Sequence, residues 1–535
     1  MAERASVFET VLLGVETTPG TPVAPVKRLQ ATGFEFSPQV PVEPFTPMGS
    51  KSPTTAIRNK EWTEGSIEGV CAFNDLIYLL SGVLTRDTPT TPSGATNTRR
   101  WNFKPENYGP DDPIIYTAQK GSSVRAEQVT HLMIDGLTIR FTREEASVSG
   151  SLLAQETTES VAISAGRNEV QTVTKGTHTG GTFTLDFDGQ ETAAIDFDAS
   201  AAEVQTALEA LSNIAPGDVA VTGNEQGPWT VTFTGTLAAQ DVAELIIDGA
   251  LLTGGAGEAV TTVTAGQTLA NVAEVPIDPD IVSIYMGDTL ANEVQIVTVQ
   301  ATGGTFTLSF TDNAGVTHTT AAIAENADGA AVQTALLALA CFVTGDVTVT
   351  GAAGGPWTVT FGGRYAGNNQ PLLVGDGTLL TGITAPAIAV AQSVAGGLSK
   401  LLRVSEFEWN ISDRFTEQMT LDDAEPSFSA YVERSPEHTC QLVMQYDAEA
   451  AALMANLRAK DTKFLRLEAW GPVIEGDFRY RARLTVPVKF TGNDQGDQDD
   501  AYSKTFDAAA MYSTVSSFDG FVEWEIDAPL AGLEA

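Results

Sequence analysis

Basic residues are scarce in this sequence of 535 residues. It contains 30 Lys and Arg against 68 Asp and Glu, which gives a formal net charge of -38. A surface that binds DNA or RNA needs clusters of basic side chains to neutralise phosphates, and the sequence has no such cluster. We therefore expect the protein to repel nucleic acid. Acidity of this kind also favours solubility, so the charge alone does not indicate a function.

Cysteine is rare as well. Cys71, Cys341 and Cys440 are far apart and show no C-x-x-C spacing, which argues against a disulfide framework and a zinc site. We expect them to be buried in a protein made in a reducing cytosol. No apolar run approaches the length of a membrane span, and the N-terminus lacks the apolar segment of a secretion signal. The sequence thus predicts a protein that is soluble where it is made and has no membrane partner.

The sequence also lacks the common catalytic motifs. Its four histidines show no H-E-x-x-H spacing, and neither G-x-S-x-G nor a phosphate-binding G-x-x-x-x-G-K-[ST] occurs. The pairs Asp186/Asp188 and Asp196/Asp198 could suggest calcium, but they alternate with apolar residues as a solvated strand face does. We therefore expect no enzyme activity, no cofactor and no metal site.

An internal duplication is the strongest feature that is present. G-G-T-F-T-L begins at Gly180 and again at Gly303, V-Q-T-A-L begins at Val204 and Val332, and G-P-W-T-V-T-F begins at Gly227 and Gly355. The order of these words is the same in both copies. The duplication predicts two inserted domains, the first repeat at 169–266 and the second repeat at 293–397.

Each repeat predicts a small β-rich domain. Apolar and polar residues alternate in the G-G-T-F-T-L and G-P-W-T-V-T-F segments, which is the pattern of half-buried strands. Ser200 and Glu203 form a capping box for one helix in the first repeat, and Asp328 takes the capping place in the second. Strands plus one helix in about 100 residues indicate a domain of immunoglobulin-like size.

The other segments, 1–168, 267–292 and 398–535, are predicted to form one core around the two repeats. Alternating runs predict strands, among them 406–411 and 137–142, and helices are expected at 73–80, capped by Asn74 or Asp75, and after Asp447. Between Pro38 and Lys60 the sequence predicts a long loop without secondary structure of its own. The fold class is therefore mainly β, a barrel or sandwich core with flanking helices plus the two repeats.

Two strands near the C-terminus carry opposite charges. Arg479, Arg481 and Arg483 alternate with apolar residues, and so do Glu523, Glu525 and Asp527. If the two strands are neighbours, we expect exposed ion pairs across the sheet, each contributing roughly 0.2–1 kcal/mol.

The order of several core motifs resembles the major tail tube protein of long-tailed (siphovirus-type) bacteriophages. These motifs are G-V-E-T-T-P-G-T from Gly14, E-W-T-E-G from Glu61, F-N-D-L-I-Y-L-L from Phe73, V-P-I-D-P from Val275 and F-E-W-N-I-S-D-R from Phe407. The repeats are similar to immunoglobulin-like decoration domains inserted in phage tail proteins. The resemblance implies rings, usually homo-hexamers, whose sheets join into one inner barrel and which stack into a tube that conducts DNA.

The resemblance also implies where the rings would stack. The stacking loop would be Pro38 to Lys60, supported by an arm at 15–25, and its basic residues fit an acidic partner such as another copy of the chain. Its candidate residues are Pro44, Phe45, Met48, Lys51, Arg58 and Lys60. Further implied partners are the tape measure protein, the tail terminator and the tail-tip proteins. The implied location is the virion, after synthesis in the cytoplasm of the host bacterium.

The resemblance implies a function for the acidic charge. An acidic lumen would let DNA pass without binding during ejection, and Glu406 and Glu408 are candidates to line it, although a solvated outer face explains them nearly as well. An alternative function is a tail-tip or surface adhesin whose repeats bind glycans of the bacterial envelope.

Overall fold

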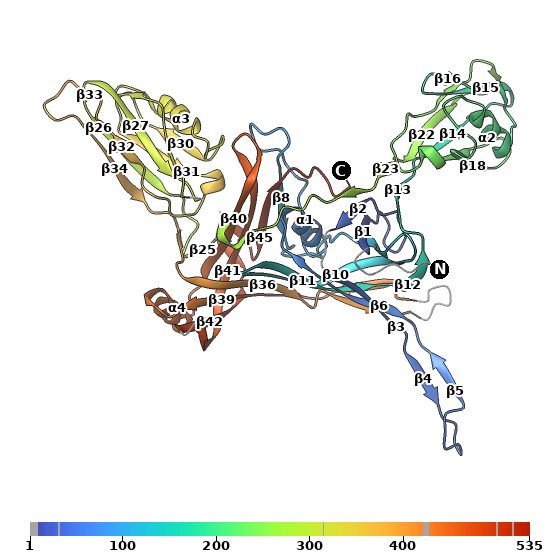
Figure 1. The fold of residues 1–535 in the computed structure, drawn as a ribbon, viewed down its shortest axis with the longest axis horizontal. Helices are drawn as coiled ribbons and strands as arrows, with labels where there is room; N and C mark the ends of the chain where they lie inside the picture. Colours follow the sequence, from blue (N-terminus) through green and yellow to red (C-terminus); the bar gives the residue numbers. More distant parts are fainter. Residues whose placement is uncertain are drawn as a thin grey trace.

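The protein is mainly β, as the sequence predicts, and consists of a core from which two domains and one hairpin project. The structure is a computed structural model, and it describes residues 9–29, 33–313, 315–420, 427–498, 501–515 and 518–534. In Figure 1 the two repeats extend from one side of the core, and the hairpin extends from the opposite side.

A long antiparallel sheet forms the base of the core. Its hydrogen-bonded order is β3-β6-β11-β10-β36-β39-β42-β41. The bounds are β3 (Gly33–Gln39), β6 (Trp62–Val70), β11 (Ala146–Ala154), β10 (Ala126–Thr142), β36 (Val404–Ser412), β39 (Glu437–Gln445), β42 (Ala501–Ala510) and β41 (Phe478–Gln498).

Two long strands connect this sheet to the upper part of the core. The first half of β41 pairs with β40 on one side and β45 on the other, and the first half of β10 pairs with β9 and β12. On one side of β41, β40 (Lys463–Glu475) pairs with β25 (Val282–Gly287), which pairs with β35 (Leu398–Lys400). On its other side, β45 (Glu523–Ala528) pairs with β8 (Arg99–Lys104), which pairs with β7 (Thr85–Arg86). Next to β10, β12 (Thr157–Val161) is one neighbour and β9 (Tyr116–Gly121) is the other, and β9 is followed in order by β1 (Thr10–Val15), β2 (Lys27–Leu29) and β24 (Ala270–Asn271). Among the described residues, pairing ends at free edges such as β3 and β7, so the strands of the core do not close into a barrel within one chain.

Helix α1 (Phe73–Ser81) is enclosed in the core, and all nine of its residues are buried. The expected caps Asn74 and Asp75 are wrong, because both lie inside the first turn and the N-cap residue is Ala72. The first backbone N–H, that of Phe73, donates instead to the carbonyl of Val275 at 3.0 Å. A neighbouring segment therefore satisfies one of the backbone N–H groups that the first turn leaves without a partner inside the helix.

The segment expected to be a loop contains strands. Residues 38–60 include the end of β3 and a hairpin of β4 (Val42–Phe45) and β5 (Thr55–Arg58), so the expectation of a loop without secondary structure is wrong. Proline favoured the loop interpretation, but it is tolerated in edge strands, where its missing N–H faces solvent. Helix α4 (Ala448–Ala459) is capped by Asp447, as predicted.

The two repeats have the same topology and separate cores. The first contains the four-stranded sheet β18-β19-β14-β22 and the second the four-stranded sheet β30-β31-β26-β34, and each repeat adds a five-stranded sheet of short strands and one helix. Trp229 stacks on Phe183, and Trp357 stacks on Phe306, both with ring centroids 5.4 Å apart. The elements are β14 (Val170–Thr174), β15 (Gly180–Phe187), α2 (Ala201–Glu209), β18 (Val219–Gly223), β19 (Trp229–Phe233) and β22 (Ala259–Thr264) in the first repeat, and β26 (Val294–Gln300), β27 (Gly303–Thr311), α3 (Gly329–Leu337), β30 (Val347–Thr350), β31 (Trp357–Phe361) and β34 (Ala387–Val394) in the second.

Both helix caps of the repeats are confirmed. The Ser200 side chain accepts from the Glu203 N–H in a complete capping box, and Asp328 accepts from the Ala331 N–H. The repeat boundaries at 169–266 and 293–397 stay a prediction.

The repeats differ in how they attach to the core. The first is joined by β13 (Gly166–Arg167) and β23 (Gln267–Thr268), which pair as a short two-stranded connection. Its Asp218 binds the N–H and hydroxyl of Thr236, both at 2.7 Å.

The corresponding pair in the second repeat is Asp346 and Arg364. Arg364 binds the Asp346 carboxylate at 2.7 Å and reaches out of the repeat to the carbonyl of Asp477 at 3.0 Å. Tyr365, next to it, lies against Trp470 of β40 with centroids 5.7 Å apart. Side chains that differ between the copies, Arg364 and Tyr365 where the first repeat has Thr236 and Leu237, therefore dock the second repeat onto the core.

The charged strands near the C-terminus lie beside this contact. Arg481 pairs with Asp527 at 2.9 Å, and Arg483 pairs with Glu525 at 3.1 Å, so the expected pairing is confirmed. The expected exposure is wrong for both arginines, which are 1% and 5% exposed. Arg483 contacts the second repeat, where the Arg364 carbonyl accepts a hydrogen bond from it, and Arg481 is enclosed by core residues, among them Asp527, Glu525 and Trp470.

A buried network therefore forms under the second repeat. Glu468 accepts from Arg483 at 2.6 Å and from Asn368 of the second repeat at 3.0 Å. Burial alone would raise the pKa of Glu525, but Arg481 and Arg483 outweigh it and hold this pKa well below its usual range. Removing one partner of such a buried network costs about 3–5 kcal/mol.

We predict that Arg364→Thr loosens the second repeat from the core without unfolding it. Threonine can bind Asp346 as Thr236 binds Asp218, but it cannot reach Asp477. Hydrogen exchange in β40 and the first half of β41 should accelerate, and the free energy of unfolding should fall by about 3 kcal/mol. Thr236→Val in the first repeat is the matched control and should leave these strands unchanged. Unchanged exchange in the Arg364→Thr variant would contradict the docking role.

We predict that Asp75→Asn stabilises the protein above neutral pH. Burial raises the pKa of Asp75 to about 7, and Glu274 adds to the effect. The folded state then holds this proton more tightly than the unfolded state, so stability falls as pH rises from about 4 to about 7. Chemical denaturation at pH 5 and pH 8 should show that the free energy of unfolding of the variant exceeds that of the original chain by a margin that grows with pH to about 4 kcal/mol. Asp112→Asn makes the same substitution at an exposed position and is the matched control for the effect of burial.

Candidate assembly interface

The β4–β5 hairpin extends beyond the long sheet. It continues from β3 and β6, and its root is closed by the hydrogen bond from Asn59 N–H to the carbonyl of Pro41 at 2.9 Å. At the far end, Thr54 N–H donates to the carbonyl of Phe45 at 3.0 Å, and Gly49 takes a positive φ of 89° in the connecting loop. Only Gly adopts this conformation without strain, so the tip turns sharply there.

Both faces of the hairpin expose apolar side chains. Register places Val42 and Pro44 on one face, and Phe45 and Ile57 on the other, while Met48 stands at the tip. About half of the Val42, Phe45 and Ile57 surface is exposed, and Met48 is fully exposed. A two-stranded hairpin without a covering layer is marginally stable in water. The hairpin should therefore become more stable when a partner covers its exposed apolar side chains.

The six residues expected to form a stacking surface all lie on this element or at its root. Pro44, Phe45, Met48, Lys51 and Arg58 are exposed, and Lys60 is half-buried. Arg58 forms an ion pair with Glu61. Val42 and Ile57 were not among the predicted residues, although each alternates with a polar neighbour along its strand, which is a signal that the sequence contains.

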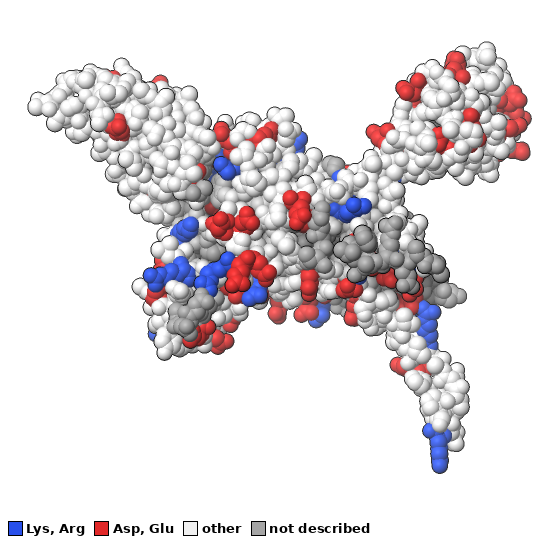
Figure 2. All heavy atoms as spheres, in the orientation of Figure 1, with Lys and Arg blue, Asp and Glu red and all other residues white. Residues whose placement is uncertain are grey.

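The hairpin is basic in an acidic protein. Residues 40–60 contain three basic residues and one acidic residue, so the local charge is 3 − 1 = +2. Figure 2 shows a basic side chain at the far end of the hairpin, while acidic side chains are scattered over the first repeat and are few on the second. The counts agree, since 169–266 contains 14 acidic and one basic residue and 293–397 contains six and one.

Glu406 and Glu408 lie on the outer face of the long sheet. Between them, Phe407 points into the core, as does Trp409. Arg140 of β10 donates to Glu406 at 2.7 Å and lies 4.0 Å from Glu408. Burial raises the pKa of Glu408, an effect that Arg140 opposes and Glu406 reinforces.

The same outer face is polar on the neighbouring strands. Residues paired in register share a face, so the alignments extend it from β36 to both sides. Hydroxyl, amide and carboxylate side chains dominate it: Thr138, Ser147, Ser149, Ser66, Glu64, Glu68, Asn410, Gln441 and Asp507. The two glutamates were predicted from alternation, but Arg140 was not, because it lies opposite Glu408 only through the pairing of β10 with β36.

Reactive groups do not gather in the described part of the chain. No group of three or more His, Cys, Asp and Glu that could hold a metal ion occurs there. Burial lowers the pKa of His131 to about 4 and that of His438 to about 3. The three cysteines are buried, as expected, and burial raises the pKa of Cys440 to about 12. Within the same ranges, no helix is long and apolar enough to cross a membrane.

We predict that Phe45→Ser combined with Met48→Ser leaves the isolated chain as stable as before. Both side chains are exposed and outside the core, so the free energy of unfolding should change by no more than about 0.5 kcal/mol. Phe34→Ser in β3 is the matched control, because Phe34 is 4% exposed. Truncating this buried side chain should cost about 3 kcal/mol or more. A large loss in the double variant, measured by urea denaturation of dilute protein, would show that the hairpin packs on its own chain.

Comparison with known proteins gives one informative similarity. No protein-family model matches the chain. Over 148 residues the chain is 34% identical to the tail sheath protein of Mycobacterium phage Bxz1. The match covers 27% of this chain and 23% of that protein, so the chain spans less than a quarter of the length of this relative.

Proposed function

We propose that this chain is a structural subunit of a phage tail, and more specifically a subunit that assembles with its own copies into the stacked rings of a tail tube. The similarity to a phage tail sheath protein supports the structural role in a phage tail. The observation that carries the tube assignment is the long sheet, which has one buried face, one polar face and free edges, and continues into a projecting hairpin.

The polar face of the sheet is suited to line a channel. It carries hydroxyls and carboxylates on neighbouring strands, including Glu406 and Glu408, and Arg140 is held in an ion pair with Glu406. DNA phosphates find few cations there, so DNA passes without binding during ejection. In this proposal, β3 and the second half of β41 are the edges through which neighbouring subunits, six in a ring, join their sheets.

The hairpin is suited to connect successive rings. Its apolar side chains are exposed on both faces, and its +2 charge differs in sign from the chain as a whole. Another copy of the chain is therefore a favourable partner, through burial of apolar surface and through charge. The proposed further partners are the tape measure, terminator and tail-tip proteins, and the proposed location is the virion.

The repeats favour a second candidate function. Ile246 and Leu251 of the first repeat are 65% and 69% exposed, and the corresponding Val374 and Leu379 of the second are both 66% exposed. Apolar residues exposed at the same place in both copies are typical of a binding surface. An adhesin that binds envelope glycans is the alternative, although Trp229 and Trp357, the side chains suited to stack on sugars, are fully buried.

Electron microscopy of the purified chain tests the proposal. We expect hollow stacked rings with lateral knobs, and we expect a variant with 42–58 replaced by Asn-Gly to stop at single rings or monomers. Circular dichroism should confirm that the shortened variant is folded, because the hairpin lies outside the core. A full-length chain that stays monomeric at every concentration and salt would contradict the tube assignment, and glycan binding by the repeats would then be measured.

A further inference from the structure

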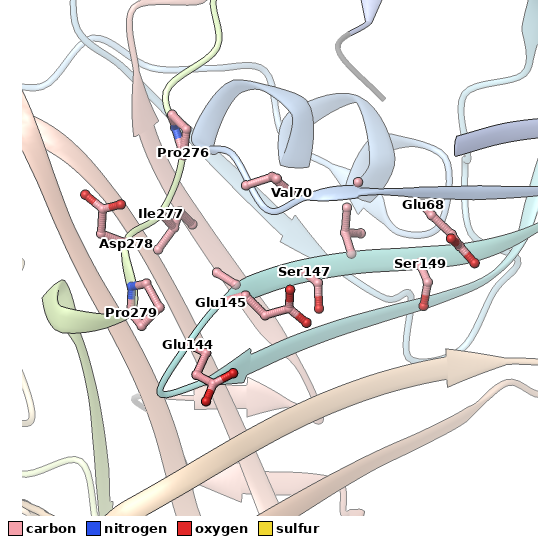
Figure 3. A pocket seen from close by; sticks show the side chains of 13 residues that line it. Glu68, Val70, Glu144, Glu145, Ser147, Ser149, Pro276, Ile277, Asp278 and Pro279 are labelled. Carbon is pink, nitrogen blue, oxygen red and sulfur yellow. The ribbon is translucent and has the colours of Figure 1, made fainter. Parts of the chain in front are cut away.

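An acidic groove lies at the end of the long sheet opposite the hairpin. It encloses about 560 Å³ between the end of β6, the turn from β10 to β11 and the segment 276–279. Figure 3 shows Glu144 and Glu145 on the turn and Asp278 on the facing segment. Thirteen residues line the groove, of which four are acidic and none is Lys or Arg.

The groove also offers apolar surface. Val70, the last residue of β6, is 45% exposed, and Ile277 forms a buried wall next to it. Among the described residues, Glu144, Glu145 and Asp278 form no ion pair. Carboxylates gathered beside an apolar wall favour a ligand that is both basic and apolar.

The direction of β6 relates this groove to the hairpin. The hairpin joins β6 just before Trp62, and the groove lies at Val70, so the two occupy opposite ends of one strand. A second copy placed end to end with the first therefore brings the hairpin of one copy toward the groove of the other. Such a head-to-tail contact repeats without limit, as stacking requires.

We infer that the groove receives the β4–β5 hairpin of the next copy of this chain. The hairpin supplies what the groove favours, since it presents the exposed basic residue Lys51 near its tip and exposes Phe45, Met48 and Ile57. Lys51, near the hairpin tip, is the basic residue placed to meet Glu144 and Glu145. This inference rests on the proposed self-assembly and names the receiving site for it.

A charge exchange between the two elements tests the inference. Lys51→Glu alone and Glu145→Lys alone should each raise the protein concentration needed for stacking about tenfold at low salt. The two changes combined should restore stacking to within about threefold of the original chain, because opposite charges face each other again. The measurement is sedimentation velocity over a concentration series, at low salt and at 0.5 M salt, where all differences should shrink.

Controls separate the inference from the proposed function. Glu225→Lys makes the same charge change on an exposed loop of the first repeat and should have no effect on stacking. If shortening the hairpin abolishes stacking but Glu145→Lys does not impair it, the groove is not the receiving site, while the tube assignment stands. If the original chain never stacks, both fail.

A second measurement applies if a reversed charge disturbs folding. Lys51→Cys combined with Glu145→Cys should give a ladder of disulfide-linked oligomers under oxidation, because the two positions meet only between copies. The three native cysteines are buried and should not contribute, as the unsubstituted chain will show. Monomer alone in the double variant, under conditions in which rings stack, would overturn the inference.

Discussion

One-sided burial of the long sheet is the constraint on which the rest of the structure depends. Successive strand residues point to opposite faces, so Phe407 and Trp409 can reach the core only if Glu406 and Glu408 face away from it. Helix α1 and the upper strands cover the apolar face, and the described chain leaves the other face polar. A sheet of this kind needs water, or a water-filled channel, on its outer side.

The same strands determine where the molecule can meet its copies. β3 and β6 continue past the sheet as a hairpin that has no covering layer, and β6 ends beside the acidic groove. Pairing also leaves β3 and the second half of β41 as edges. These features are costly in an isolated subunit, because apolar side chains and backbone groups stay in water. They become favourable once copies assemble, which links the fold directly to the proposed tube.

The duplicated domains show how a small sequence difference changes an attachment. Asp218 and Asp346 occupy the same place, but one binds Thr236 within its repeat and the other binds Arg364, which extends to the core. The docked repeat then buries a network that includes Arg483 and Glu468. Buried ion pairs often add little stability compared with apolar packing. However, most other orientations of the repeat would leave a buried charge without its partner, and this is costly. The network therefore fixes the orientation of the second repeat, whereas the first is joined by a short two-stranded connection.

The sequence by itself determined many of the features that depend on neighbours along the chain, although it missed the β4–β5 hairpin and the start of α1. The alternation of apolar and polar residues located β36 and β41, and the duplication located the repeats. Residue types that cap helices, placed just before a helical pattern, located the caps at Ser200, Asp328 and Asp447. These patterns repeat every two to four residues, so they are visible without a fold.

Only the tertiary structure decided which surfaces are covered. Arg481 and Arg483 look like exposed strand residues, but core residues enclose the first and the second repeat contacts the other, and a carbonyl from the distant Val275 binds the first N–H of α1. Likewise, the groove exists only because Val70, Glu145 and Asp278 converge from three separate segments. Burial depends on contacts between residues that are far apart in the sequence, and a local sequence pattern does not show which distant residues meet.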